Sequence, residues 1–474
     1  MIKTLQYNPE WLFKRTGDPF ADAGAVVIRE MQKPDEDLIK TIERATRIYV
    51  DDWGSSLQAF FLNSTITHTS NKGEKGFVNT MDFFKRLLAD EEPYEVGYCR
   101  ILGEKTKLFR AGRDNHILSG SGTYINFHHG FQDGLKVSKE ILIRIFFLPL
   151  GVVSMGKIAV LGCNRPEIEA WFVQQNYREN IHRIGQRQTD GVLKSEFSNP
   201  ANALFEFVQQ YLAEYEGQLP EEEPVEIHLY HFTNFAGAPN IELHCFSAPL
   251  FQFYRKMRHR QYAASWKAFI RDQYFNSKQK GAIYNAKSDQ IELETKKEKQ
   301  AFGYEEFKTW YNPTLQKLLR NDSILRDFLR WCGKQYQLKQ PFSLFPIVEL
   351  YQIELRNMKK STLDKIREIA DYLVSGDADK IKKRLNALRL NVSKPHELRR
   401  FLIKTIGEYY LEKNPDKSLI SLEEFVTDLF PDGSWGMEIR DLLLIAVYEK
   451  LCAQNITVEI EEGDEVTIIE IEQE

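Results

Sequence analysis

The chain has 474 residues, of which 42% are hydrophobic, 28% charged and 12% aromatic, and its formal net charge is -5. This composition excludes global disorder, and at roughly 100–200 residues per domain the length predicts two or three domains. No apolar run reaches the ~18 residues that cross a bilayer, and the first residues lack the apolar core of a signal peptide, so we expect a cytoplasmic protein. Five widely spaced cysteines without a Cys-x-x-Cys pair favour reduced thiols over a disulfide framework.

A helix rich in small residues is predicted over about 18–31. Asp18 is a good N-cap, and Pro19 suits the first helical position, where a missing N–H costs nothing. Residues 21–25 then read Ala-Asp-Ala-Gly-Ala, although Gly24 costs about 1 kcal/mol relative to alanine inside a helix. We interpret this turn as a site of close packing against another backbone.

The rest of the chain up to about residue 340 mixes helices and strands. Hydrophobic periodicity and turn residues define the elements, and two polar, glycine-bearing segments at 67–76 and 110–134 read as loops. We predict a helix over 35–49, an apolar helix or a buried strand over 139–153, strands over 157–161 and 225–230, and a charged loop over 282–303.

After about residue 340 the pattern changes to successive amphipathic helices joined by short connections, which indicates an antiparallel bundle. Apolar periodicity and capping residues place helix starts near Ser361, Pro395, Ser421 and Met437.

The chain is therefore predicted to be an α+β protein with two main regions. Residues 1–340 form a mixed α/β N-terminal region, and residues 341–474 form a C-terminal antiparallel helical bundle. The segment 454–474 carries eight acids and no base, and we read it as an acidic tail.

Histidines cluster in two places without matching a metal motif. His128 and His129 stand near Asp133, and His228 and His231 stand upstream of His244. Neither spacing is that of a known metal site, and residues 228 and 231 would face opposite sides of a strand. We predict no bound metal and no cofactor.

No arrangement of residues indicates an enzyme. The chain lacks a P-loop, a dinucleotide-binding fingerprint, a Gly-x-Ser-x-Gly motif and an identifiable Cys/His pair. The tetrapeptide Arg-Asp-Asn-His at 113–116 leaves one alternative open, a metal-dependent nuclease that uses the region of His116, His128 and His129. Metal analysis and cleavage assays with Mg²⁺ or Mn²⁺ would reveal such an activity.

Basic zones favour nucleic-acid binding instead. Residues 255–280 contain eight Lys/Arg and one acid, and residues 356–404 contain fourteen Lys/Arg and six Asp/Glu. Such cations would bind phosphates, and the interleaved Tyr254, Tyr262 and Trp266 could stack on bases. The alternative is a solvated basic face whose aromatic residues are buried. The candidates for contacts to the nucleic-acid backbone are Arg255, Lys256, Arg258, Arg260, Lys382, Lys383, Arg384, Arg399 and Arg400, and we expect those at 382–400 to be exposed.

Three sequence blocks occur in a characteristic order. They read NPEWLFKRTGDPFADAGAVVI over 8–28, GRDNHILSGSGTYINFHHGFQDGL over 112–135 and RIFFLPLGVVSMGKIAVL over 144–161. Over about residues 8–165 the chain resembles the large subunit of type I-B CRISPR effector (Cascade) complexes, in the Cst-type branch. The C-terminal region resembles that family by architecture only.

The resemblance implies a non-enzymatic role. The large subunit of such a complex works with crRNA and with backbone, end-capping and small subunits. It reads the protospacer-adjacent motif (PAM) in double-stranded DNA, helps to unwind it, stabilises the R-loop and helps to recruit the nuclease-helicase. In guided systems the protein reads a short duplex motif and base pairing reads the rest.

Polar loop residues are the candidates for reading the PAM, because such side chains can enter a groove and contact base edges. The candidates are Asn71, Lys72, Lys75, Arg110, Arg113 and Asn115. The further alternative is a purely structural ribonucleoprotein scaffold whose basic faces meet only RNA and other subunits.

The resemblance also implies a zinc-finger-like module at about 95–150. Relatives often carry a pair of Cys-x-x-Cys motifs flanking the block at 112–135. Here the corresponding positions read Cys99-Arg-Ile-Leu102 and Ser138-Lys-Glu-Ile141. A structural zinc needs about four ligands, so we expect a degraded module that is held by packing, without zinc.

A final implication concerns Met358. In this subtype the helical C-terminus resembles the small subunit, which can also be made separately by internal translation. Met358 stands just before the predicted helix near Ser361, so we expect a fragment that runs from Met358 to Glu474. The alternative is that it is an ordinary methionine, one of seven in the chain.

Overall fold

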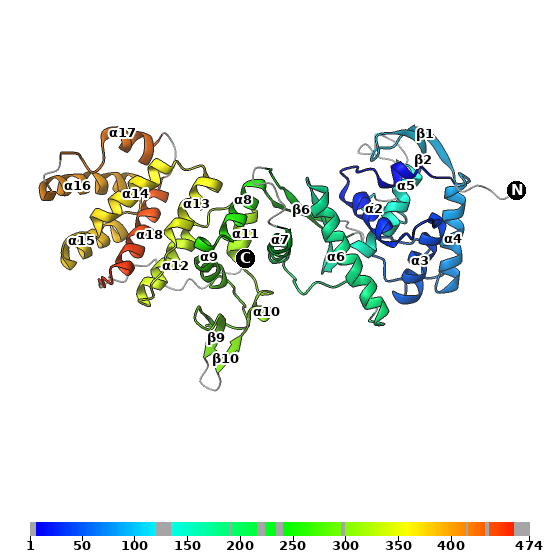
Figure 1. The fold of residues 1–474 in the computed structure, drawn as a ribbon, viewed down its shortest axis with the longest axis horizontal. Helices are drawn as coiled ribbons and strands as arrows, with labels where there is room; N and C mark the ends of the chain where they lie inside the picture. The colour runs from blue at the N-terminus through cyan, green and yellow to red at the C-terminus, as the bar shows by residue number, and fades with distance from the viewer. Residues whose placement is uncertain are drawn as a thin grey trace. The chain divides into compact units, whose positions relative to one another are not determined.

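The computed structural model describes residues 6–119, 134–188, 191–215, 223–233, 240–294, 299–413, 416–431 and 436–458. The α+β class predicted from the sequence is confirmed, since helices alternate with small antiparallel sheets (Figure 1). The chain divides into two compact units, Met1–Ser247 and Ala248–Glu474. Among the described helices, none combines the length and apolar character required to cross a membrane.

The helices of the first unit include the predicted small-residue helix. Its N-cap is confirmed, because Asp18 accepts hydrogen bonds from the backbone N–H groups of Phe20 at 3.0 Å and Ala21 at 2.8 Å, with Pro19 at the first position. The helical segments are α1 (Pro9–Phe13), α2 (Pro19–Met31), α3 (Leu38–Arg47), η1 (Ile48–Asp52), α4 (Glu74–Leu88), α5 (Lys139–Phe147), η3 (Leu148–Gly151), α6 (Pro166–Gly185) and α7 (Pro200–Tyr215).

The small residues of α2 allow close packing, as the sequence predicts. α2 packs against α5, η3 and α6. A Cβ atom on Gly24 would lie 1.9 Å from the backbone oxygen of Arg144 on α5, so only glycine lets the two helices approach this closely. The residue that weakens α2 as an isolated helix is therefore required by its tertiary contact.

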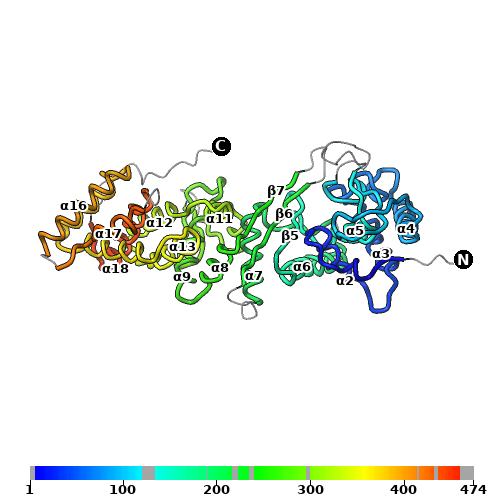
Figure 2. Tube along the Cα trace, turned by 90° about the horizontal axis from the view of Figure 1, so that it is seen from above, coloured from blue at the N-terminus to red at the C-terminus, as the bar shows by residue number. Residues whose placement is uncertain are grey.

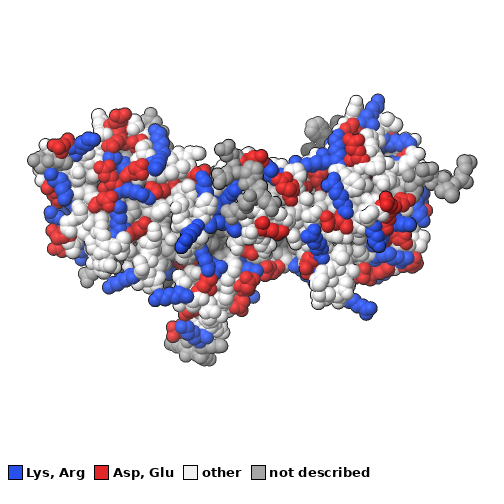
Figure 3. Space-filling view, in the orientation of Figure 1, with Lys and Arg blue, Asp and Glu red and all other residues white. Residues whose placement is uncertain are grey.

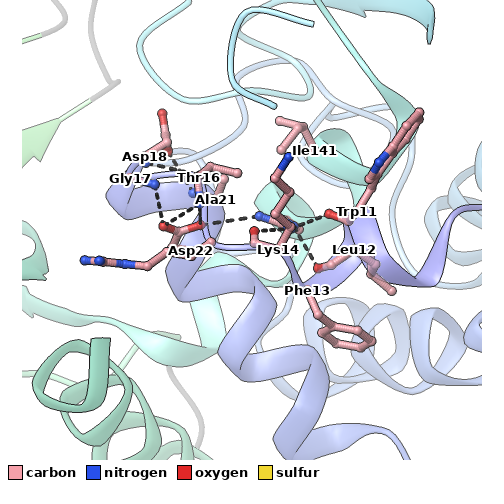
Figure 4. A network of polar contacts seen from close by, with 12 residues as sticks. Trp11, Leu12, Phe13, Lys14, Thr16, Gly17, Asp18, Ala21, Asp22 and Ile141 are labelled. Carbon is pink, nitrogen blue, oxygen red and sulfur yellow. Dashed lines mark hydrogen bonds and ion pairs between the residues drawn. The ribbon is translucent and has the colours of Figure 1, made fainter. Parts of the chain in front are cut away.

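Arg144 is fully buried and holds three segments together. Its guanidinium donates to the backbone oxygens of Leu12 at 2.8 Å and Lys14 at 2.7 Å, and also to that of Trp11. It lies 3.4 Å from the Asp22 carboxylate on α2. Figure 4 shows this network around the end of α1 and the start of α2.

The Asp22 carboxylate is also bound by the turn that precedes α2. It accepts hydrogen bonds from the backbone N–H of Thr16 at 3.0 Å and of Gly17 at 2.8 Å, and from the Thr16 hydroxyl at 2.8 Å. A buried charge is tolerated only when it is paired and hydrogen-bonded. The Arg144–Asp22 pair meets that condition with groups from α1, α2 and α5.

Two sheets complete the first unit. One has the order β1-β2-β3 and the other the order β4-β5-β6-β7, and all pairings are antiparallel. Their strands are β1 (Tyr94–Tyr98), β2 (Lys105–Ala111), β3 (Leu135–Val137), β4 (Val153–Met155), β5 (Lys157–Cys163), β6 (Ile227–Thr233) and β7 (Asn240–Phe246).

Helices cover both faces of the four-stranded sheet. On one face Phe20 of α2 contacts Phe232 edge-on, with ring centroids 5.2 Å apart. On the other face Phe205 of α7 contacts Phe246 at 4.8 Å. β7 is an edge strand of the described sheet, and Figure 2 shows it beside β6.

The second unit is built mainly of helices, among which α18 is central because it packs against α12, α13, α14 and α15. A small sheet of order β10-β9-β8 belongs to the same unit. The elements are α8 (Ala248–Met257), α9 (Arg260–Arg271), β8 (Ile283–Asn285), β9 (Gln290–Glu294), β10 (Lys299–Phe302), α10 (Tyr304–Phe307), α11 (Pro313–Leu319), α12 (Leu325–Gln337), α13 (Phe345–Arg356), α14 (Lys360–Leu373), α15 (Ala378–Leu390), α16 (Pro395–Lys413), α17 (Leu422–Glu424), η5 (Phe425–Leu429) and α18 (Glu438–Ala453).

The boundary between the compact units lies at residues 247/248 rather than near 340. The reason is that α12, which precedes residue 340, packs on α18. The stacked rings of Tyr336 and Tyr448, with centroids 5.4 Å apart, belong to this contact. Residues 248–340 therefore share a core with the C-terminal helices.

Three local predictions need correction or confirmation. The described part of the segment 282–303 forms the strands β8, β9 and β10 where the sequence predicts a loop, and Ile291 and Leu293 of β9 are buried. The helix near Ser361 has Lys359 as its N-cap, while the Ser361 hydroxyl donates to Asp428 at 2.9 Å. The capping box at Ser421 is confirmed.

The contact at Gly24 generates a stability prediction. In Gly24→Ala the added methyl group overlaps the Arg144 backbone, so we expect a net loss of about 1–3 kcal/mol despite the better helix propensity of alanine. Urea unfolding, followed by hydrogen exchange in α2 and α5, measures this loss. The control is Gly185→Ala in α6, where the methyl group meets nothing within 4 Å. Equal effects of the two variants would contradict the packing interpretation.

Candidate nucleic-acid interface

In the first unit the segment before α4, which contains the predicted loop 67–76, meets the turn after β2, which begins the predicted loop 110–134. The backbone N–H of Leu62 donates to the backbone oxygen of Arg113 at 2.7 Å. Ser64 and Thr65 from one segment and Asn115 from the other line a small cavity of about 30 Å³. We call residues 62–75 and 110–115 the loop–turn surface, because they form one continuous region although 35 positions separate residues 75 and 110.

The first part of this surface is anchored on α4. The Asn71 side chain accepts a hydrogen bond from the Asn79 amide at 3.1 Å, and the hydroxyls of Thr65 and Thr80 lie 2.8 Å apart. A Cβ atom on Gly76 would lie 2.5 Å from the Asn71 backbone oxygen. Glycine at this position therefore lets the loop close onto the start of α4.

Lys72 and Lys75 project from this anchored loop. Both are exposed, and within the described residues neither forms an ion pair. The acid between them, Glu74, is bound by Arg47 at 2.7 Å, and the Arg47 guanidinium lies 3.4 Å above the Phe77 ring. This hydrogen bond lowers the pKa of Glu74 and pairs its carboxylate with Arg47. The two ammonium groups are thus available to an external anion.

The second part is the turn after β2. Arg110 is 52% exposed and lies 4.0 Å from Asp114, while Arg113 is exposed and forms no ion pair among the described residues. Asn115 has a different role. Its amide donates to the Arg110 backbone oxygen at 3.0 Å and accepts from the Gly112 N–H at 2.8 Å. Asn115 therefore closes the turn, and the arginines are its exposed groups.

The two stretches that the family resemblance aligns with zinc-binding motifs meet in space. The backbone N–H of Ser138 donates to the Cys99 sulfur at 3.4 Å, and Cys99 is fully buried. Leu102 and Ile141, at the remaining two positions, are also buried. Of these four positions only Cys99 offers a thiol, and Leu102 and Ile141 contribute to the apolar core.

His116 does not form an exposed catalytic group. Its side chain is buried, and its Nδ1 lies 3.0 Å from the Ile117 backbone oxygen. Burial lowers the pKa of His116 and raises the pKa of the neighbouring Asp18, although the two groups partly offset these shifts. His128, His129 and Asp133 lie outside the described residues.

In the basic zone of α8 and α9 some cations lie at the surface, but two of the aromatic residues proposed to stack on bases are buried. Tyr254 and Trp266 are buried, and the Trp266 ring packs edge-on against Phe253 at 5.4 Å. They therefore belong to the core instead of offering a stacking platform. Arg260 is exposed and Arg255 and Arg258 are half-buried, while Lys256 pairs with Glu354 at 2.5 Å.

Arg384 in the second basic zone is buried, contrary to the prediction that it is exposed. It donates to the Ser375 backbone oxygen at 2.9 Å, to the Tyr372 hydroxyl at 2.7 Å and to Glu412 at 2.7 Å. It therefore ties α14, α15 and α16 together. The physical reason is that Arg384 shares the inward face of α15 with Ile381 and Leu388.

The other candidates of this zone lie nearer the surface. Lys383, Arg399 and Arg400 are exposed and Lys382 is half-buried. Acidic side chains are interspersed with cations on the described part of the face drawn in Figure 3. The surface seen there is mixed in charge instead of forming one continuous basic stripe.

Helix α16 also presents an apolar face to solvent. Ile403, Tyr410 and Leu411 are 61%, 57% and 84% exposed. Their spacing of i, i+7 and i+8 places them on one side of the helix. A group of large apolar side chains on one exposed helix face is typical of a surface that binds another protein.

Met358 lies between α13 and α14. It is buried, and it follows Asn357, whose left-handed conformation (φ 58°) ends α13. A fragment that begins here would contain α14 to α18 but would lack α12 and α13. The side of α18 that packs on α12 would then be exposed to solvent unless another protein surface buried it.

No family model matches this chain, and no curated protein matches it. The family resemblance therefore rests on the three sequence blocks.

The contrast between Arg384 and Lys383 generates a prediction. Although burial opposes the shift, hydrogen bonds from Lys380, Arg384 and Tyr372 lower the pKa of Glu412 to about 2. The stabilisation by this carboxylate is complete above its ordinary pKa of 4.5 and is lost as the pH falls toward 2. We expect Arg384→Met to cost about 3 kcal/mol at pH 7 and to weaken the pH dependence between 4.5 and 2.

The matched control is Lys383→Met on the same helix, for which we expect a change within about 0.5 kcal/mol. Chemical unfolding of the second unit at pH 7 and pH 3 measures both variants. A neutral effect of Arg384→Met would show that this guanidinium does not hold the three helices together.

Proposed function

We propose that the protein is the non-enzymatic large subunit of a crRNA-guided type I-B Cascade. In this role it reads the PAM in double-stranded DNA, helps to unwind the duplex and stabilises the R-loop. It also helps to recruit the nuclease-helicase. The loop–turn surface is the observation that carries the proposal, because two segments that are separate in the sequence meet through Leu62 and Arg113, and each of them carries exposed cations.

The chemistry of this region suits a DNA groove. Lys72, Lys75 and Arg113 are exposed cations on loops that are anchored by backbone and side-chain hydrogen bonds. Anchored loops restrict the positions of such groups before DNA arrives, which lowers the entropy cost of binding. Lysines supply phosphate contacts, and an arginine fork can read guanine in the major groove.

The contact between Cys99 and Ser138 is consistent with the proposal. The two stretches that the resemblance aligns with zinc-binding motifs lie side by side, as the proposed degraded module requires. The exposed apolar face of α16 supports a protein partner, which in this proposal is another subunit of the complex. A purely structural scaffold would share that face but would show no PAM-dependent affinity.

The loop–turn surface is tested by Lys72→Ala/Lys75→Ala in the assembled complex. We expect PAM-containing duplex to bind more weakly by about 1–3 kcal/mol if a lysine reads a base edge, with the sequence preference relaxed at that position. If both lysines bind only phosphates, all duplexes should weaken alike and the salt slope should fall by about 2. Filter binding at several salt concentrations distinguishes these results.

The control is Lys85→Ala, an exposed lysine at the opposite end of α4. It should leave both the affinity and the salt slope unchanged. Unaltered affinity, salt slope and PAM preference in the double variant would remove this loop from the DNA interface.

The internal start is tested by Met358→Leu. Leucine has nearly the volume of methionine, so this buried position should tolerate it with a cost below about 1.5 kcal/mol. We expect the native complex to lose a fragment of residues 358–474 while the full chain persists. Intact-mass analysis reads both species. If no fragment starting near residue 358 exists before the substitution, Met358 is an ordinary core residue.

A further inference from the structure

A second site with its own chemistry lies on the four-stranded sheet of the first unit. Strand register places His231 of β6 directly opposite Glu242 of β7, with His244 two residues further along β7 on the same face. The His231 Nδ1 and the His244 Nε2 lie 3.7 Å and 4.0 Å from the same oxygen of Glu242. The three ligand-type atoms lie within 4.8 Å of one another.

The His231 ring is fixed in one orientation. Its Nε2 lies 3.1 Å from the backbone oxygen of Met155, and because a carbonyl only accepts, this nitrogen carries the hydrogen. In the neutral ring the Nδ1 therefore bears a lone pair. That atom is enclosed and has no hydrogen-bond partner among the described residues, and the side chain is 8% exposed.

The arrangement brings two acceptors face to face. While the ring is neutral, the lone pair of His231 Nδ1 and the carboxylate oxygen of Glu242 repel one another, and either a proton on Nδ1 or a metal cation between the two atoms removes this repulsion. At 3.7 Å they are too far apart to share a proton in a hydrogen bond. A metal ion with bonds of about 2.0–2.1 Å in tetrahedral geometry holds its ligand atoms about 3.3–3.4 Å apart. The separations of 3.7 Å and 4.0 Å from the Glu242 oxygen would shorten by roughly 0.3 to 0.7 Å on metal binding, and the two ring nitrogens would close to a similar distance.

The Glu242 carboxylate is oriented by a hydrogen-bonding partner, as metal-ligating carboxylates commonly are. Its other oxygen accepts from the Lys157 ammonium of β5 at 2.5 Å, and this hydrogen bond lowers the pKa of Glu242. Ligating histidines and carboxylates are commonly oriented by such outer partners. Here the Met155 carbonyl orients the histidine and Lys157 orients the carboxylate.

We propose that His231, Glu242 and His244 bind a divalent transition metal ion, with zinc as the best match. Two imidazoles and one carboxylate are a zinc-type ligand set that leaves a fourth tetrahedral position for water. This site lies outside the residues assigned to nucleic-acid binding and does not depend on the proposed function.

A neighbouring group on the other face of the sheet provides the control. His228 and Cys245 are directly opposite one another, but the His228 Nε2 lies 2.8 Å from Glu226 and the Cys245 thiol donates to the same oxygen at 3.7 Å. Burial raises the pKa of Cys245 to about 11, so the thiol stays protonated. Its polar atoms are already partnered, and we assign it no metal.

The test is a titration of the chelator-treated full chain with Zn²⁺ by calorimetry and with Co²⁺ by visible absorption. We expect one equivalent to bind and the melting temperature to rise on binding. Glu242→Gln and His244→Gln should each weaken binding at least about tenfold and remove the thermal shift. His228→Gln should change neither.

Glu242 is 49% exposed, so its glutamine variant should fold, and circular dichroism of each metal-free variant checks this. The absence of saturable binding would overturn the proposal. It would also be overturned if Glu242→Gln and His244→Gln bound like the unaltered chain, if His228→Gln lost binding, or if Co²⁺ gave a thiolate charge-transfer band. None of these results would affect the DNA-binding prediction for Lys72 and Lys75.

Discussion

The first unit depends on one buried guanidinium. Arg144 enters from α5 and binds backbone oxygens at the end of α1 together with the Asp22 carboxylate of α2. Gly24 then lets α2 approach the Arg144 backbone itself. A charge enclosed in this way is stable only while every partner is present. The network therefore joins the first and third sequence blocks, residues 8–28 and 144–161, into one rigid core.

The polar loops derive their order from this core. α4 and the turn after β2 form the sides of the loop–turn surface, and Leu62 and Arg113 connect them through the backbone. A rigid scaffold that carries exposed polar loops is the usual way in which a protein recognises a ligand. In this molecule the helices around Arg144 supply stability, and Lys72, Lys75 and Arg113 supply exposed positive charge.

Local features could be predicted from the sequence, and long-range ones could not. Asp18 as an N-cap and the close packing of α2 follow from residue type and spacing, but the partner of Gly24 lies 120 positions away. The opposite orientation of His228 and His231 follows from strand periodicity, whereas the pairing of His231 with Glu242 depends on register. The sequence predicts Arg384 to be exposed because the neighbouring Leu and Ile positions account for the core, whereas its burial depends on Glu412 of another helix.

The central claim is that this chain works within an RNA-guided complex. Its most direct test is a native purification of the tagged full chain, in which bound RNA is sequenced and co-purifying proteins are weighed intact. The account predicts repeat-derived guide RNA together with several partner proteins. A chain that purifies alone and without RNA would contradict it.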